Sequence, residues 1–194
     1  AKVGTIVPLY REENKYYIDE SNLDNLVFLD NGTQFVITSE KSGYMHLYLY
    51  DLNGRERQAI TKGNFDIIDF YGYDPVRKLF YYSSYEESPL EKYIYSINEK
   101  GLKKKLTPVK GWNEASFSKN FNYYINVVSN TDTPPVTALY NAKGKQVRVL
   151  EDNKAVKEAV KAYNLAKPEF IQIPAADGKT MLNAWTVSYT HLTL

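Results

Sequence analysis

Cysteine is absent from the 194-residue chain, and histidine occurs only as His46 and His191. The absence of cysteine excludes disulfides, thiol catalysis and cysteine-ligated metals. Two histidines far apart in the sequence argue against a histidine-rich metal site. We therefore expect no metal and no cofactor.

An excess of charge of either sign is also absent, because 24 Lys and Arg face 23 Asp and Glu, for a net charge of +1. This balance gives no electrostatic reason to expect nucleic acid or an anionic membrane as a partner. The basic run Lys103-Lys104-Lys105 is interpreted as a solvated turn or an edge strand protected from aggregation. No apolar run approaches the roughly 20 residues that span a bilayer, so we expect no membrane span.

Tyrosine, by contrast, is abundant, with 18 Tyr against 8 Phe and 2 Trp. Tyrosine suits strands that have one buried and one wet face, because its ring packs while its hydroxyl finds water or a partner. The 43% of hydrophobic residues is enough for a real core. The length allows one large domain, or a domain plus part of another, and the composition favours an all-β fold.

A hairpin is predicted within SGYMHLYLYDLNGRERQAITKG, residues 42–63. The segment 47–50 alternates aliphatic and aromatic residues, Asn53-Gly54 offers a tight reversal, and residues 58–61 resume an extended pattern. Asn-Gly between two such runs is a strong hairpin signal, because both residues tolerate positive φ.

The hairpin pattern recurs twice along the chain, with corresponding positions 44 to 46 residues apart, such as Ile60, Leu106 and Leu150. A weaker strand precedes each copy, at residues 25–29, 66–71 and 113–117. Four short antiparallel strands per unit, at a period near 45 residues, are typical of β-propeller blades. An ordinary β-sandwich is the alternative.

The repeat divides the chain into an end of a preceding blade (1–20, with 5–9 as a candidate strand) and three blades, at 21–63, 64–110 and 111–153. Known propellers usually close with about four to eight blades. The chain is therefore expected to be part of a larger propeller, or an open array.

The period changes after residue 153. Apolar residues recur at helical spacing up to residue 166 and stop before Pro168, which predicts a linker helix at 154–167. Two further strands, at 169–173 and 181–187, flank Asp177-Gly178-Lys179 and have no counterpart in the repeats. We expect a different domain to start at 168–187, followed by an atypical tail at 188–194.

Several segments resemble one known family: KYYIDE (15–20), TSEKSGYMHLYLYDLNG (38–54), ITKGNFDIIDFYGYD (60–74), YEESPLEKYIYSI (85–97), NTDTPP (130–135), RVLEDNKAVKEAV (148–160) and PEFIQIPAADGKTMLNAWTV (168–187). Together they resemble bacterial dipeptidyl peptidase IV-like serine peptidases of the prolyl oligopeptidase family. In that family an eight-bladed propeller precedes an α/β-hydrolase domain.

The resemblance implies an all-β partial propeller, followed by a short helix and the first hairpin of a hydrolase domain. It also implies a parent enzyme that releases N-terminal dipeptides with proline or alanine second. Peptides with a penultimate proline or alanine would be the substrates of this parent enzyme, and the parent enzyme would form a homodimer. A periplasmic or secreted location is implied too, although the chain starts at Ala1 and carries no signal peptide.

The resemblance also indicates what lies elsewhere. The family nucleophile sits in a Gly-Trp-Ser-Tyr-Gly-Gly elbow, and no Gly-x-Ser-x-Gly occurs in this chain. We therefore expect no catalytic residue here, and the chain alone to be inactive. His46 is interpreted as structural, and His191 falls in the tail SYTHLTL, which departs from the family and suggests a truncated or vector-derived end.

The family holds the substrate's amino group with a pair of glutamates, because two carboxylates can neutralise a desolvated ammonium. The pairs Glu12-Glu13 and Glu86-Glu87 lack the aromatic context of that pair, so both are expected to be solvated loop residues. Near strand ends, where a propeller faces its central channel, Tyr16, Tyr17, Ser39 and Glu40 are candidates for lining a substrate path.

The rival hypothesis is a non-enzymatic propeller that binds a protein or glycan partner, because a fold alone does not determine function. A related oligopeptidase or acylaminoacyl-type enzyme with the same two-domain plan is a third hypothesis. The segment 168–187 favours an enzyme, because a pure binding propeller has no reason to append a non-repeat hairpin.

Overall fold

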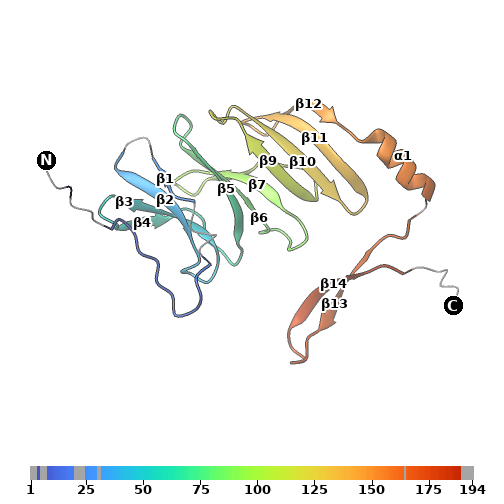
Figure 1. Cartoon of the computed structure of the whole chain (residues 1–194), viewed down its shortest axis with the longest axis horizontal. Coiled ribbons are helices and arrows are strands. Elements are labelled where there is room, and N and C mark those ends of the chain that lie inside the picture. The colour runs from blue at the N-terminus through green and yellow to red at the C-terminus, as the bar shows by residue number, and fades with distance from the viewer. Residues whose placement is uncertain (1–3, 5–7, 20–24, 30–31, 164, 189–194) are drawn as a thin grey trace.

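The computed structural model describes residues 4, 8–19, 25–29, 32–163 and 165–188. Three four-stranded antiparallel sheets follow one another along the chain, and a helix and a two-stranded hairpin come after them (Figure 1). The predicted all-β partial propeller is therefore confirmed. The residues of the tail from 189 on, including His191, lie outside the described residues.

Within each sheet the strands are adjacent in chain order. Blade 1 comprises β1 (Val27–Phe28), β2 (Gln34–Ser39), β3 (His46–Asp51) and β4 (Glu56–Ala59). Blade 2 comprises β5 (Ile67–Asp74), β6 (Leu79–Ser84), β7 (Tyr93–Ile97) and β8 (Lys103–Lys105). Blade 3 comprises β9 (Trp112–Phe117), β10 (Tyr123–Asn130), β11 (Thr133–Asn141) and β12 (Gln146–Glu151).

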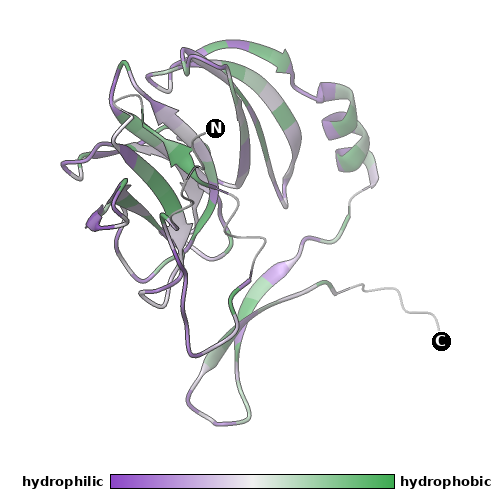
Figure 2. Ribbon diagram, turned by 60° about the vertical axis from the view of Figure 1, so that its left-hand side comes forward, coloured by the Kyte–Doolittle hydropathy of each residue, from purple (hydrophilic) through white to green (hydrophobic). Residues whose placement is uncertain are grey.

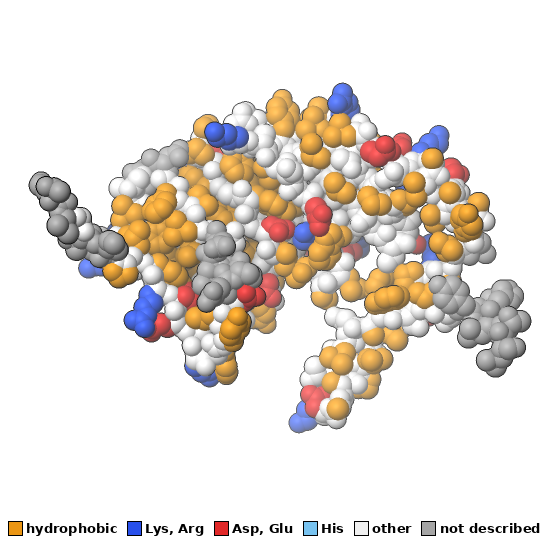
Figure 3. Space-filling model, in the orientation of Figure 1, with side chains coloured by type: hydrophobic (Ala, Val, Ile, Leu, Met, Phe, Trp, Pro, Cys, Tyr) orange, Lys and Arg blue, Asp and Glu red, His pale blue; other side chains and the backbone are white. Residues whose placement is uncertain are grey.

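The helix α1 (Lys154–Tyr163) confirms the predicted helix but not its limit at 167, because residues 165–167 are not helical. The strand β13 (Glu169–Pro174) pairs with β14 (Met181–Thr186) as the predicted final hairpin. The hairpin extends away from the blades (Figure 1), and its apolar side chains are exposed, as the orange spheres at the lower right of Figure 3 show. The lysine run 103–105 forms β8, an edge strand, as expected.

The core consists of layers between neighbouring sheets. On β6, Phe80 and Tyr82 pack into the layer shared with blade 1, while Tyr81 packs into the layer shared with blade 3. This division follows from the strand period of two, which points successive side chains to opposite faces. Figure 2 shows the corresponding hydrophobic stretches along the strands of the blades.

The same five-residue turn closes the outer hairpin of each blade. Its first residue is Asp51, Asn98 or Asn141, and the side-chain Oδ1 of that residue accepts hydrogen bonds from the backbone N–H groups two and four residues later, at 2.9–3.1 Å. The glycines at the fourth position have φ values of +73°, +79° and +79°. An Asx side chain and a glycine thus specify each reversal, and the three predicted turns are confirmed.

The two ends of the array differ. On blade 1, Leu9 and Tyr10 pack against the face turned away from blade 2. The predicted strand at 5–9 is not formed at Leu9, and residues 5–7 lie outside the described residues. On blade 3, Tyr123 and Ile125 expose 50% and 40% of their surface on the face away from blade 2. Blade 3 therefore has an uncovered apolar face.

Candidate functional site on the exit face

The connections at one end of the blades form the candidate site. Because the strands are antiparallel and adjacent in chain order, the β2–β3, β6–β7 and β10–β11 loops and the connections between blades lie at the same end. The chain also leaves β12 for α1 from this end. We call it the exit face, defined by residues 40–45, 60–66, 85–92, 106–111, 131–132 and 152–153.

The non-repeat segment remains in contact with the exit face. The Lys167 Nζ lies 2.8 Å from the Asp132 Oδ1 in the β10–β11 loop. The Asn153 side-chain amide donates to the carbonyl oxygen of Pro135. The segment that leads to the β13–β14 hairpin therefore contacts the same end of the blades as the loops, through one exposed ion pair.

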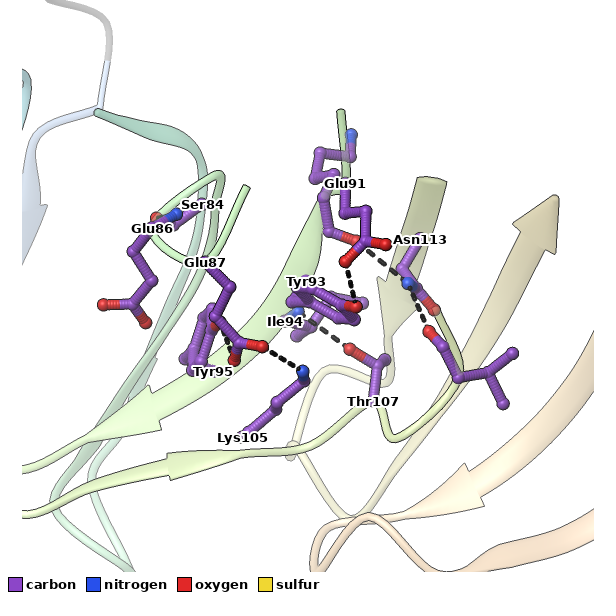
Figure 4. Close-up of polar contacts among 12 residues, drawn as sticks. Ser84, Glu86, Glu87, Glu91, Tyr93, Ile94, Tyr95, Lys105, Thr107 and Asn113 are labelled. Atoms are coloured by element: carbon purple, nitrogen blue, oxygen red, sulfur yellow. Dashed lines mark hydrogen bonds and ion pairs between the residues drawn. The ribbon is translucent and has the colours of Figure 1, made fainter. Parts of the chain in front are cut away.

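The pair Glu86-Glu87 lies in the β6–β7 loop on this face (Figure 4). The expectation that both are solvated is wrong for Glu86, whose side chain exposes only 8% of its surface and forms an ion pair with Lys103. Its Oε1 is buried and accepts no hydrogen bond from the described residues. Glu87 is more exposed, and its Oε2 forms an ion pair with the Lys105 Nζ at 2.7 Å.

Hydroxyl groups from β7 bind the same loop. The Tyr95 hydroxyl donates to the Glu87 Oε1 at 2.9 Å, and the Tyr93 hydroxyl donates to Glu91 (Figure 4). The hydrogen bond from Lys105 lowers the pKa of Glu87. Burial, together with the hydrogen bond to Glu87, raises the pKa of Tyr95. Glu87 is thus held ionised and Tyr95 neutral at physiological pH.

A second polar cluster lies at the junction of blades 2 and 3. Lys92 is 5% exposed, and its Nζ lies 3.1 Å from the Asp69 Oδ2 and 3.7 Å from the Glu114 Oε1. The ammonium also lies 4.9 Å from the ring centre of Trp112, whose indole N–H donates to Glu114 at 3.1 Å. A buried lysine between two carboxylates fixes the first strand of each of these blades relative to the other.

Asp69 binds three donors in this cluster. Its Oδ2 accepts from the Ser83 hydroxyl at 2.7 Å as well as from Lys92 and Tyr71. Burial raises the pKa of Asp69, but the Ser83 hydrogen bond and the Lys92 charge outweigh it and lower the pKa overall. Sequence reasoning missed this cluster, since its members lie between positions 69 and 114 and only the folded sheets bring them together.

The four predicted substrate-path residues occupy different environments. Tyr16 and Tyr17 expose 71% and 85% of their surface, whereas Ser39 is fully buried and its hydroxyl donates to the Glu12 Oε1 at 2.7 Å. Tyr17 and Glu40 line one small pocket, to which Glu12 also contributes. Glu40 further lines a groove of about 270 Å³ between blades 1 and 2, with Asp66 and Tyr85 on its other side.

His46 occupies a structural position. The imidazole is 2% exposed, with Nδ1 3.0 Å from the Thr61 Oγ1 and Nε2 3.0 Å from the carbonyl oxygen of Gly63. Both ring nitrogens are therefore occupied by groups of blade 1. Among the described residues, no group of three or more His, Cys, Asp or Glu side chains could hold a metal ion.

The exit face presents carboxylates and aromatic rings. The carboxylates of Glu40 and Asp66 line one groove with Tyr85, whose ring centre lies 5.9 Å from that of Trp112. Asp69 and Glu114 are already paired with Lys92. Carboxylates beside aromatic rings suit a cationic group with apolar substituents. Among the described residues, no serine side chain forms a hydrogen bond with a histidine, and the Thr61 hydroxyl that contacts His46 is buried within blade 1.

Three blades in series, each packed on the next and built on one repeated turn, define a segment of a β-propeller. The model of the family "Dipeptidyl peptidase IV (DPP IV) N-terminal region" matches residues 1–135. The chain belongs to this family. No helix in the described part of the chain is long and apolar enough to cross a membrane.

Relatives named dipeptidyl peptidase 4 resemble the chain over most of its length. A probable dipeptidyl peptidase 4 of Aspergillus flavus is 30% identical over 173 residues, which are 82% of this chain and 22% of that protein. The dipeptidyl peptidase 4 of Trichophyton rubrum is 30% identical over 172 residues, with the same coverage of both chains. The chain thus spans about a fifth of the length of these relatives.

Solved structures give the same result. The crystal structure of Porphyromonas gingivalis dipeptidyl peptidase 4 superposes with a TM-score of 0.86 at 40% identity, and covers 92% of this chain and 25% of that one. A putative dipeptidyl aminopeptidase IV from Bacteroides ovatus has a TM-score of 0.68 at 24% identity, over 81% of this chain and 25% of that one, and supports the fold alone.

Proposed function

We propose that the chain is the C-terminal part of the propeller of a serine exopeptidase that releases N-terminal Xaa-Pro and Xaa-Ala dipeptides. Its role is that of a substrate gate, and the catalytic triad is supplied by a hydrolase domain that starts with the β13–β14 hairpin. The domain limits 21–63, 64–110, 111–153, 154–167 and 168–187 are part of this proposal. So are a secreted or periplasmic location and a homodimeric parent protein.

The observation that carries the proposal is the position of the exit. The loops of all three blades and the start of α1 share one face, and Lys167 holds the non-repeat segment against Asp132 on that face. A domain that continues from β14 would therefore cover the exit face. Peptides would pass along the exit face before they reach that domain. A binding propeller without a second domain has no use for this attachment, which favours the gate over the binding module.

The proposal assigns recognition to the exit face. A peptide that enters amino end first carries an ammonium group, which suits the carboxylates and aromatic rings of this face. Tyr17 and Glu40, which share a pocket, would line the path, and Tyr16 would lie at its margin. Ser39 would act indirectly, because its buried hydroxyl positions Glu12.

The test compares this chain with the complete protein that contains it, using glycyl-prolyl-p-nitroanilide as substrate. We expect the complete protein to release the chromophore and residues 1–194 alone to release none. In the complete protein, Glu40→Gln and Tyr17→Ala are expected to raise KM and leave kcat unchanged, since binding along a path is lost and no reacting group is touched. An exposed control, Lys179→Gln, should change neither constant.

Dipeptide release by residues 1–194 alone would contradict the proposal. If the Glu40 and Tyr17 variants had the same kinetic constants as the Lys179 control, Glu40 and Tyr17 would not belong to the substrate path.

A further inference from the structure

The other ends of the strands carry a second surface, which meets the exit face at the outer edge of the blades, where Glu99 and Lys100 line one pocket with Thr61 and Lys62. This second surface is formed by the turns 52–55, 98–102 and 142–145 and by the loops 75–78 and 118–122, and we call it the turn face. Neighbouring blades are bonded here: Gln58 Nε2 lies 3.0 Å from the carbonyl oxygen of Glu99, and Lys104 Nζ lies 2.8 Å from that of Lys143. The turn face is therefore one continuous surface across three blades.

Basic side chains dominate the turn face. Its exposed charged residues are Arg55, Arg77, Lys78, Lys100, Lys119, Lys143 and Lys145, with Glu99 as the one exposed acid among the described residues of these connections. Asp51 and Asp74, at the bases of two connections, are 6% and 1% exposed and cap their own turns. Their charges are therefore directed inward.

Most of these basic groups have no carboxylate partner. Arg77 binds Asp74 and the Asn122 side chain, both at 2.6 Å. Among the described residues, none of the other six basic groups forms an ion pair. The near-zero net charge of the chain thus hides a concentration of bases on the turn face, whereas the connections of the exit face carry both signs with acids in excess.

Apolar side chains project among the bases. Val76, at the tip of the β5–β6 loop, exposes 86% of its surface, and Leu102, after the β7–β8 turn, exposes 70%. Each is followed directly by a basic residue, Arg77 and Lys103. Arg77 and Lys103 are paired with Asp74 and Glu86, but Lys78 and Lys100, each two residues from one of the aliphatic side chains, form no ion pair with a described residue. Exposed aliphatic residues near such positive charge combine the two interactions that hold a protein at a lipid surface: apolar burial and attraction to anionic head groups.

We propose that the turn face docks on an anionic lipid surface. The basic residues would contact the head groups while Val76 and Leu102 enter the interfacial region. The exposed aliphatic tips favour a lipid surface over a soluble polyanion, which would be bound by charge alone. In this orientation the exit face and the β13–β14 hairpin point to solution, so docking leaves the proposed gate open.

The first test is co-sedimentation of the full chain with phosphatidylcholine vesicles that contain or lack phosphatidylglycerol. Binding is expected only with phosphatidylglycerol. It is expected to be lost in high salt, because salt screens the attraction between the basic residues and the head groups. Combined Lys100→Glu, Lys119→Glu and Lys143→Glu should weaken binding by at least about tenfold. The matched control, with the same change of charge, combines Lys110→Glu, Lys154→Glu and Lys179→Glu, and should bind like the unchanged chain.

The second test uses the absence of cysteine, which allows one thiol to be labelled with an environment-sensitive dye. The label at Val76→Cys is expected to shift its emission when the vesicles are added, and the label at Ala176→Cys, in the β13–β14 turn, is not. Circular dichroism confirms that the variants fold. Equal loss of binding in both charge variants, a shift at residue 176 alone, or binding to heparin but not to vesicles would overturn the proposal.

Discussion

The hydroxyl of Thr61 accepts a hydrogen bond from the backbone N–H of Leu47 at 3.0 Å, and Thr107 accepts one from Ile94 at the same distance. Both threonines follow the outer strand of their blade and are at most 2% exposed. The paired residues of β3 and β4 end at Tyr48, and those of β7 and β8 end at Tyr95. In each blade the backbone N–H just before that point therefore takes the threonine hydroxyl as its acceptor.

Thr107→Val is therefore expected to destabilise the chain by about 1–3 kcal/mol, because the shape is kept while a buried N–H loses its acceptor. Urea unfolding, followed by circular dichroism, measures the change. Thr186→Val removes an exposed hydroxyl from β14 and serves as the control. Equal midpoints for the two variants would show that the Thr107 hydroxyl contributes nothing to the blade.

Two glycines provide a test of blade packing. Gly144 and Gly101 occupy equivalent turn positions, both with φ of +79°. A Cβ on Gly144 would lie 2.8 Å from the carbonyl oxygen of Leu106 in the preceding blade, whereas a Cβ on Gly101 would meet nothing within 4 Å. The backbone strain of alanine, about 1–2 kcal/mol, is common to both sites, so the difference reports on the contact between blades.

Gly144→Ala is expected to lower the free energy of unfolding by more than Gly101→Ala does. Thermal melts of both variants, on the same preparation, give the comparison. If Gly101→Ala costs as much as Gly144→Ala or more, the close approach of Gly144 to blade 2 is not a feature of the folded chain.

Acid is expected to weaken the β6–β7 loop. Lys105 lowers the pKa of Glu87 in the folded state below its ordinary value of 4.5. The ionised carboxylate therefore contributes its full stabilisation at pH values above 4.5. That contribution is lost as the pH falls through the lower folded-state pKa. Urea midpoints measured between neutral pH and acid should fall less steeply for Glu87→Gln than for the unchanged chain. Glu99→Gln, on the turn face, is the control, and an identical slope for Glu87→Gln would contradict this assignment.

The uncovered face of blade 3 is expected to drive self-association of the chain, since apolar strands without a packing partner invite one. Ile125→Lys adds a charge to this face and should shift sedimentation velocity profiles toward the monomer. The control, Val156→Lys, changes an exposed residue of α1. A chain that is monomeric at every concentration would contradict the expectation.

The sequence predicted most of this architecture because its signals are local. Asn53-Gly54 specifies a turn through two adjacent residues, and the strand predicted at 169–173 matches β13 to within one residue. The solvent exposure of Glu86 was predicted wrongly for the opposite reason. Its burial depends on Lys103, 17 residues away, and on the packing of blade 2, neither of which a pair of adjacent glutamates reveals.

The same reason explains why Lys92 was missed. A lone lysine before a strand gives no local signal, and its partners Asp69 and Glu114 belong to the first strands of two different blades. Net charge was uninformative about surfaces for a related reason, since a sum over the chain cannot show that exposed bases gather on the turn face.

The most direct measurement for the proposed function is the coding sequence of the complete protein beyond residue 187. The account predicts a Gly-Trp-Ser-Tyr-Gly-Gly elbow followed by an aspartate and a histidine, in that order, which would supply the nucleophile, its orienting acid and its base. A reading frame that ends without such an elbow would contradict the peptidase gate, and a propeller that binds a protein or glycan would then be the better account.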